Sequence, residues 1–325
     1  MSLTRLGGIA TAGRRALTVS TLCATLALAV PALAATDAAV PDGPLVDAAW
    51  LAKNLDNPKV RVFEVSVDPG VYERGHIPGA VNISWHSDLV DPVKRDIVSA
   101  EAFETLLEKA GVDKDTTIIL YGDNNNWFAA WGGWVFNQYG LGERVKLLDG
   151  GRKYWEKQAL PLDTKAPSYA KTDITLPPAK PELRARLVNV LEVVDGKKGA
   201  VIVDIRSADE FSGKLFAPEG SKELSIRAGH VPGAKNVTWS KAVDAETGKF
   251  KSKEELKKLY AEAGVDGSKP IIVYCRIGER SSHTWYALSR ILGYDVKNYD
   301  GSWTEYGNSV GVPVVNLAGT VWQGK

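Results

Sequence analysis

Cysteine is nearly absent from this chain of 325 residues, which contains only Cys23 and Cys275. A disulfide-stabilised scaffold is therefore excluded. If Cys23 is removed with the amino-terminal segment described below, Cys275 is the single remaining thiol and no internal disulfide can form. Such a solitary thiol is a dimer bridge, a buried apolar side chain or a reactive group.

The chain also lacks a cluster of histidines and an excess of charge of one sign. Its four histidines are scattered, so the sequence offers no metal-binding cluster. Basic and acidic residues are nearly balanced, 40 against 39, and no basic patch is visible, which argues against nucleic acid as a partner. The composition is that of a globular protein, and the length suggests two domains.

An apolar stretch without charged residues occupies positions 16–30, behind a segment whose charges are all basic. The small residues Ala32 and Ala34 follow it in an A-x-A pattern, so residues 1–34 are predicted to be a secretory signal peptide. We therefore expect an exported protein, periplasmic or secreted, with no stable membrane insertion after cleavage. An uncleaved anchor is the alternative, and the twin-arginine route at Arg14 and Arg15 stays open.

The chain contains an internal repeat. The segment "GHIPGAVNISW" (75–85) returns as "GHVPGAKNVTW" (229–239), and further landmarks recur in the same order. A repeat of this length is a duplicated domain rather than a short solenoid unit. We predict domains at 41–163 and 185–325, joined by a proline-rich linker at 164–184.

Strand and helix patterns alternate in the second copy. The pattern predicts an α/β fold, in which each copy forms a parallel sheet flanked by helices. A helix over 252–264 begins with a capping box of Ser252 and Glu255. The remaining predicted elements are strands at 200–205, 270–274 and 295–299 and a helix at 281–293.

Cys275 lies at the carboxyl end of a predicted central strand, 270–274, and ligands bind at this end of the strands in open α/β folds. Gly278 permits a tight loop before the next helix, and Arg276 and Arg280 supply two positive charges. Both features favour the thiolate over the thiol. We therefore expect an accessible, ionised thiol beside an anion site, rather than a buried apolar cysteine.

The stretch "CRIGERSSHTW" (275–285) resembles the active loop of the rhodaneses, the thiosulfate sulfurtransferases. The resemblance extends over nearly all of the chain beyond the predicted signal peptide, through "VDAAW", the two "GH(I/V)PGA" segments, "DIRS", "YDGSW" and "VWQGK". It implies two tandem rhodanese-like domains. The first is expected to be an inactive scaffold, because Gly122 and Asp123 stand where the thiol would be.

The resemblance also implies a mechanism. Cys275 attacks the outer sulfur of thiosulfate, sulfite leaves, and the resulting cysteine persulfide passes its sulfur to cyanide or a thiol in a ping-pong reaction. No metal or organic cofactor is required. Arg276 and Arg280 are expected to hold the oxygens of the leaving dianion, unless Arg280 is a structural brace paired with an acid. The loop that cradles the persulfide through its amides comprises Arg276, Ile277, Gly278, Glu279, Arg280 and Ser281.

Four further residues are candidates for a supporting role. Asp204 and Arg206 match the "D-x-R" strand end that lies near the site in this family, although a surface salt bridge is an alternative for them. Glu210 stands where some relatives carry a basic residue, and it is a candidate partner for Arg276 or Arg280. Trp50 is expected either to form a wall of the site or to pack in the core or between domains.

Other functions remain open at this stage. Arg276 favours thiosulfate over 3-mercaptopyruvate as the donor, because relatives that use mercaptopyruvate tend to have small residues after the cysteine. A persulfide carrier without turnover uses the same loop. Phosphatases of related fold separate cysteine and arginine by five residues, whereas this loop has four. The physiological donor and acceptor and the oligomeric state are not determined by the sequence.

Overall fold

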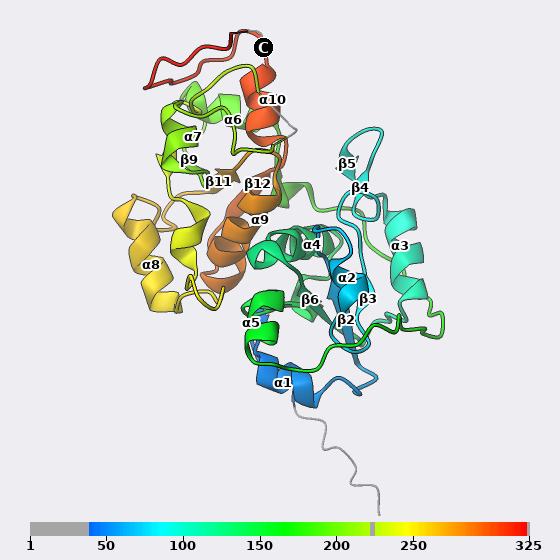
Figure 1. The fold of residues 1–325 in the computed structure, drawn as a ribbon. Helices are drawn as coiled ribbons and strands as arrows, with labels where there is room; N and C mark the ends of the chain where they lie inside the picture. Colours follow the sequence, from blue (N-terminus) through cyan, green and yellow to red (C-terminus); the bar gives the residue numbers. More distant parts are fainter. Residues whose placement is uncertain (1–38, 222–224, 324–325) are drawn as a thin grey trace, which may run out of the picture. The chain divides into compact units, whose positions relative to one another are not determined.

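The computed structural model describes residues 39–221 and 225–323 (Figure 1), so the predicted signal peptide lies outside the described residues. The first copy contains a five-stranded sheet in which all neighbours are parallel. Its order is β1 (Leu45–Val46), β7 (Val145–Leu148), β6 (Thr117–Tyr121), β2 (Val60–Glu64) and β3 (Val81–Asn82).

The second copy repeats this sheet strand for strand, again with parallel neighbours. The strand that ends before Cys275 is the central one, as the sequence predicted. The predicted α/β class and the duplication are therefore confirmed. The order is β8 (Arg184–Ala185), β12 (Val296–Tyr299), β11 (Ile271–Tyr274), β9 (Val201–Asp204) and β10 (Lys235–Asn236).

Helices cover both faces of each sheet (Figure 1). In the first copy they are α1 (Ala48–Lys53), α2 (Val71–Arg74), α3 (Ala100–Lys109), α4 (Trp127–Gln138) and α5 (Gly151–Lys157), with a small antiparallel hairpin of β4 (Val90–Asp91) and β5 (Asp96–Ile97). In the second copy they are α6 (Leu187–Val194), α7 (Ala208–Ser212), α8 (Lys253–Glu262), α9 (Glu279–Trp285) and α10 (Ser302–Asn308).

Short helical segments complete the described chain. Three-residue or four-residue turns are present at η1 (Asn124–Asn126), η2 (Gly142–Arg144), η3 (Pro181–Leu183) and η4 (Trp239–Ala242), and a wider π-type segment, η5 (Tyr286–Ile291), continues α9. Within the described residues, no helix combines the length and the apolar character that crossing a bilayer requires.

One hydrophobic core joins the two copies. Successive side chains of a strand point to opposite faces, so Ile118 and Leu120 of β6 lie in this shared core, whereas Ile119 faces a separate core on the other side. Helices α4 and α9 pack against each other inside the shared core. Gly133 of α4 permits the close approach, because a Cβ atom there would lie 3.2 Å from the ring of Tyr286.

Most predicted elements of the second copy agree with the structure. The capping box of α8 is present, with Ser252 N donating to Glu255 Oε2 at 2.9 Å and Glu255 N donating to Ser252 Oγ at 3.3 Å. The helix predicted at 281–293 begins earlier, at Glu279, because Gly278 adopts a left-handed conformation with φ of 110° and can precede a helix immediately. The active loop is therefore shorter than the sequence suggested.

The corresponding loop of the first copy has no room for a side chain at its start. A Cβ atom on Gly122, which aligns with Cys275, would lie 2.3 Å from the carbonyl oxygen of Val65. The next residue, Asp123, accepts N–H groups of Val67 at 3.1 Å and Asp68 at 2.8 Å. The first copy has thus replaced the reactive group with backbone contacts that fix its loop.

We expect Gly122→Ala to lower the free energy of unfolding by about 1–3 kcal/mol, because the added methyl overlaps backbone that cannot move independently. Urea unfolding followed by circular dichroism measures the change. Gly199→Ala is the matched control, since Gly199 is exposed and has no atom within 4 Å of the position that an added methyl would take. Equal unfolding midpoints for the two variants would contradict the expectation.

Candidate active site

Cys275 lies at the carboxyl end of β11, with an exposed fraction of 1%. Its N–H donates to Ser302 Oγ at 3.0 Å, and its carbonyl accepts the N–H of Trp303 at 3.1 Å. The start of α10 is therefore bonded to the backbone of Cys275, while the side chain belongs to the shared hydrophobic core. The expectation of an accessible thiol is wrong, because residues distant along the chain bury this side chain in that core.

Two polar groups nevertheless lie next to the sulfur. The N–H of Gly278 donates to Cys275 Sγ at 3.1 Å, and Ser302 Oγ lies 4.0 Å from it. Burial lowers the pKa of Arg280, but the nearby sulfur of Cys275 and the carboxylate of Glu210 outweigh burial and leave that pKa raised. Cys275 is therefore a buried sulfur with a hydrogen-bond donor and a cation nearby.

Gly278 is held in position from several sides. Its carbonyl accepts Ser281 Oγ at 2.8 Å, Ser282 Oγ at 2.9 Å and Asn298 Nδ2 at 3.2 Å. A Cβ atom on Gly278 would lie 2.8 Å from the Cα of Asp300, so only glycine fits this turn. These contacts hold the turn in which the N–H of Gly278 donates to the sulfur.

Sequence reasoning missed two residues that support the loop. Asn298 is fully buried on β12, and a polar side chain within a predicted buried strand is the signal that could have revealed it. Arg95 comes from the first copy, and its Nη2 donates to the carbonyl of Ile277 at 2.8 Å. No pattern in the sequence connects two residues so far apart along the chain.

Arg280 is paired with Glu210, as the structural-brace alternative predicted. Arg280 Nη2 lies 3.0 Å from Glu210 Oε1, and Nη1 lies 3.3 Å from Oε2. Burial raises the pKa of Glu210, but the bonds and charge of Arg280 outweigh it and hold that pKa below its usual value. Glu210 also accepts the N–H of Ser207 at 3.1 Å, so the brace is anchored to the start of α7.

Asp204 and Arg206 form a buried pair, so the surface salt bridge considered for them is wrong. Arg206 Nη2 lies 2.6 Å from Asp204 Oδ2 and 2.7 Å from the carbonyl oxygen of Gly229. Tyr274 donates its hydroxyl to Asp204 at 2.6 Å. Tyr274 faces the core opposite to the one that holds Cys275, so this pair braces the strand end from behind the sulfur.

The other predicted loop residues differ in how far they are buried. Ile277, Glu279 and Ser281 are buried, and Arg276 is half-buried at the start of the loop. The carbonyl of Arg276 accepts the N–H of Thr304 at 2.9 Å. The loop is therefore fastened to α10 as well as to α9.

Trp50 does not form the wall that the resemblance suggested. It lies on α1, where its ring packs against the separate core of the first copy, the one that contains Ile119. Its Nε1 donates to the carbonyl of Ala39 at 3.1 Å. Trp127 of α4 lies near the loop instead, with its ring centre 5.9 Å from the guanidinium carbon of Arg280. The packing alternative for Trp50 is therefore the one that the structure supports.

The rhodanese-like domain family matches residues 47–158 and 189–309. Similar proteins include "Putative thiosulfate sulfurtransferase 1" of Mycobacterium bovis, which is 53% identical over 272 residues that cover 83% of this chain and 96% of the relative. "Sulfur carrier protein TtuD" of Thermus thermophilus is 48% identical over 274 residues, which cover 83% of this chain and 95% of that protein.

Solved structures of similar fold agree with these matches. SseA from Escherichia coli, described as a 3-mercaptopyruvate sulfotransferase, has a TM-score of 0.68 and 29% identity and covers 80% of this chain and 99% of its own. An ergothioneine biosynthesis enzyme from Chlorobium limicola has a TM-score of 0.72 at 22% identity, covers 84% of this chain and 70% of its own, and shows the fold alone.

We expect Glu210→Gln to lower the free energy of unfolding at pH 7 by about 3 kcal/mol, because it leaves Arg280, whose side chain is only 13% exposed, without a counter-charge. The folded-state pKa of Glu210 is lowered, so its contribution is complete above its unfolded pKa of about 4.3 and is lost as the pH falls through the folded value. The difference in unfolding free energy between Glu210→Gln and the unsubstituted protein should therefore shrink only as the pH falls below about 4.3. Urea unfolding between pH 7 and pH 3 measures it.

Glu254→Gln is the control for this pH series, because Glu254 is exposed on α8. We expect its unfolding free energy to stay within about 0.5 kcal/mol of the unsubstituted protein. A Glu210→Gln difference that is negligible at pH 7, or that persists unchanged at pH 3, would contradict the proposed role of the pair.

Proposed function

Because this chain belongs to the rhodanese-like family, we propose that it is a thiosulfate sulfurtransferase that moves sulfane sulfur from thiosulfate to cyanide or a thiol through a persulfide on Cys275. The observation that supports this most is the N–H of Gly278 directed at Sγ from 3.1 Å, at the end of the central strand. The names of the relatives favour the same donor.

The proposed reaction has two displacement steps. The thiolate of Cys275 attacks the outer sulfur of thiosulfate, the sulfur–sulfur bond of the donor breaks, and its electron pair leaves with sulfite. The acceptor then attacks the outer sulfur of the persulfide, and the electron pair of that bond returns to Cys275 as thiolate. The N–H of Gly278 stabilises the anionic sulfur at the beginning and end of this cycle.

The burial of Cys275 limits how a donor can approach. The terminal sulfur is the narrow end of thiosulfate, so it can enter where the sulfonate group cannot. We assign the sulfonate oxygens to Arg276, because it follows Cys275 directly in the chain and is only half-buried. A planar guanidinium suits an oxyanion because its N–H donors form a fork.

Two other functions have specific support. The likeness to SseA favours 3-mercaptopyruvate as an alternative donor at the same cysteine. The identity to the Thermus sulfur carrier protein favours a carrier that forms the persulfide but gives its sulfur to another protein. Cys275 forms the persulfide in every case, so the three functions differ only in donor and acceptor.

We expect intact mass spectrometry to show a gain of about 32 Da, one sulfur atom, after thiosulfate is added to the purified protein. Cyanide should remove this mass and produce thiocyanate. Cys275→Ser should show neither effect, and a gain that persists in this variant would contradict the proposed mechanism. If thiosulfate adds sulfur to Cys275 but no steady-state thiocyanate is formed, the carrier function is favoured. If only 3-mercaptopyruvate adds the sulfur, it replaces thiosulfate as the proposed donor.

The related phosphatase chemistry is tested in the same preparation with p-nitrophenyl phosphate. We expect no release of p-nitrophenol that depends on Cys275. The loop has four residues between the cysteine and Arg280, one fewer than in the phosphatases of related fold. Release that disappears in Cys275→Ser, without thiocyanate formation from the intact protein, would replace the sulfurtransferase proposal.

We also propose that the protein is exported and cleaved near Ala34, on the strength of the basic and apolar segments that precede this residue. Amino-terminal sequencing of protein expressed from the full gene should begin close to Ala35. A mature protein that begins at Met1 would contradict the proposal.

A further inference from the structure

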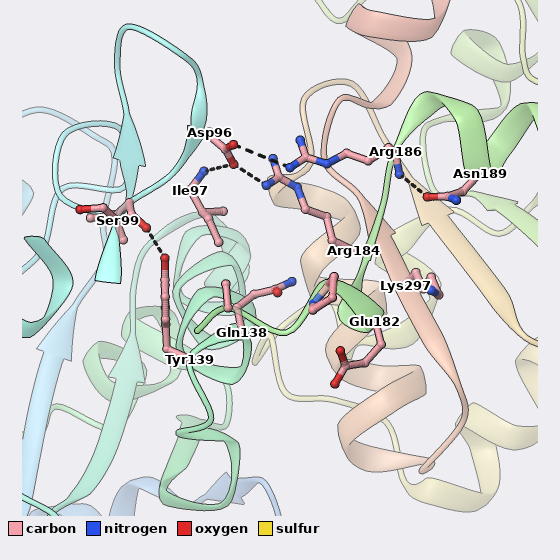
Figure 2. Close-up of a pocket in the computed structure, with 13 residues that line it drawn as sticks. Asp96, Ile97, Ser99, Gln138, Tyr139, Glu182, Arg184, Arg186, Asn189 and Lys297 are labelled. Atoms are coloured by element: carbon pink, nitrogen blue, oxygen red, sulfur yellow. Dashed lines mark hydrogen bonds and ion pairs between the residues drawn. The ribbon is translucent and has the colours of Figure 1, made fainter. Parts of the chain in front are cut away.

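A polar groove of about 740 Å³ lies where the β4–β5 hairpin, the end of α4, the linker and the start of α6 meet (Figure 2). Cys275 does not line this groove. The charged side chains that line it are Asp96 from the first copy and Glu182, Arg184, Arg186 and Lys297 from the segment that leads into and forms the second. The groove is therefore separate from the sulfur site.

A carboxylate from the first copy occupies the basic side of the groove. Figure 2 shows Arg184 and Arg186 converging on Asp96. Arg184 is buried and makes a tight ion pair with Asp96, whereas the contact of Arg186 is longer, at 3.7 Å. Burial raises the pKa of Asp96, but its bonds to Arg184 outweigh burial and leave that pKa lowered. Asp96 therefore remains an anion in this position.

Two helices begin at the groove. Ser99 caps the ten-residue α3, and Arg186 precedes the eight-residue α6, and both residues line the groove. Helix N-termini carry partial positive charge and free N–H groups. Lys297 of β12 adds a full positive charge without an ion pair to any described carboxylate. The basic residues that line the groove outnumber the acidic ones by three to two, and with the two helix N-termini they favour an anion.

An unpartnered donor lies in the same wall. Gln138, at the end of α4, has an exposed fraction of 1%, and its Nε2 has no hydrogen-bond partner among the described residues. Buried amide groups are rarely left without a partner, because an unmade bond is unfavourable by about 1–3 kcal/mol. A ligand oxygen in the groove would supply the missing acceptor.

We propose that this groove binds a small oxyanion, a phosphate, sulfate or carboxylate group, through Arg186, Lys297 and the amide of Gln138. The carboxylate of Asp96 acts as an internal anion that the ligand displaces from Arg186. This binding site goes beyond the sulfur-transfer function and does not depend on it.

The groove is connected to the active loop. Arg184, which contacts Asp96, also holds both oxygens of Asp300, at 2.8 Å and 2.6 Å. Asp300 packs directly against Gly278, whose N–H donates to Cys275 Sγ. An anion that competes with Asp96 changes the surroundings of Arg184 and, through Asp300, the position of the loop. Occupancy of the groove should therefore alter the access of reagents to Cys275.

Isothermal titration calorimetry tests the binding step, with inorganic phosphate and succinate as probes at constant ionic strength. The protein carries Cys275→Ser, so sulfur chemistry is absent and the result is independent of the proposed activity. We expect saturable binding of at least one probe, weakened about tenfold or more by Arg186→Gln, Lys297→Gln or Gln138→Met. Lys269→Gln is the control, because Lys269 is exposed and does not line the groove.

The variants also separate lost binding from lost folding. Gln138→Met keeps a side chain of similar size and removes the unpartnered amide, so its urea midpoint should equal or exceed that of the parent protein. An absence of saturable binding, or equal affinity in the groove variants and Lys269→Gln, would overturn the proposal. Binding that Arg276→Gln abolishes and the groove variants leave intact would place the anion at the active site and overturn it as well.

The link to the loop is tested in protein that retains Cys275. Iodoacetamide alkylation of Cys275, followed by mass spectrometry, should proceed at a rate that changes at least twofold when phosphate or succinate saturates the groove. The change should be absent in Lys297→Gln and present in Lys269→Gln. A rate that does not respond to a bound probe would overturn the coupling between the groove and the loop.

Discussion

The backbone turn at Gly278 fixes the groups that lie next to the sulfur of Cys275. Its N–H donates to Cys275 Sγ, its carbonyl accepts three side-chain donors, and its lack of a side chain lets Asp300 lie against it. The loop has few other ways to fold, because Ile277 and Arg276 are also fixed through their carbonyls. A pre-positioned donor next to a reacting atom needs no reorganisation when charge develops on that atom.

Duplication explains why the loop can be held so firmly. Each copy builds the same sheet, but only the second places a thiol after its central strand. The first copy has filled the equivalent space with the backbone of Val65 and uses its own helix α4 to pack on α9. It also sends Arg95 to the carbonyl of Ile277. The first copy therefore contributes both a hydrophobic surface and a hydrogen bond to the second.

Carboxylates neutralise most of the buried arginines around the site. Arg280 pairs with Glu210, Arg206 with Asp204, and Arg184 with Asp300 and Asp96. Buried charges are tolerated only when they are paired and hydrogen-bonded, and removing one partner destabilises the fold strongly. The charge of Arg280 beside the sulfur is thus balanced by Glu210.

The sequence by itself determined the duplication, the α/β class and the place of Cys275 after a buried strand, because repeat spacing and side-chain periodicity are local properties. It also indicated that Glu210 could pair with Arg276 or Arg280. Only the tertiary structure decided that the thiol is covered, that α9 begins at Glu279, and that Arg95, Asn298 and Asp300 support the loop. These contacts join residues distant along the chain, so their geometry depends on how both sheets pack around one core.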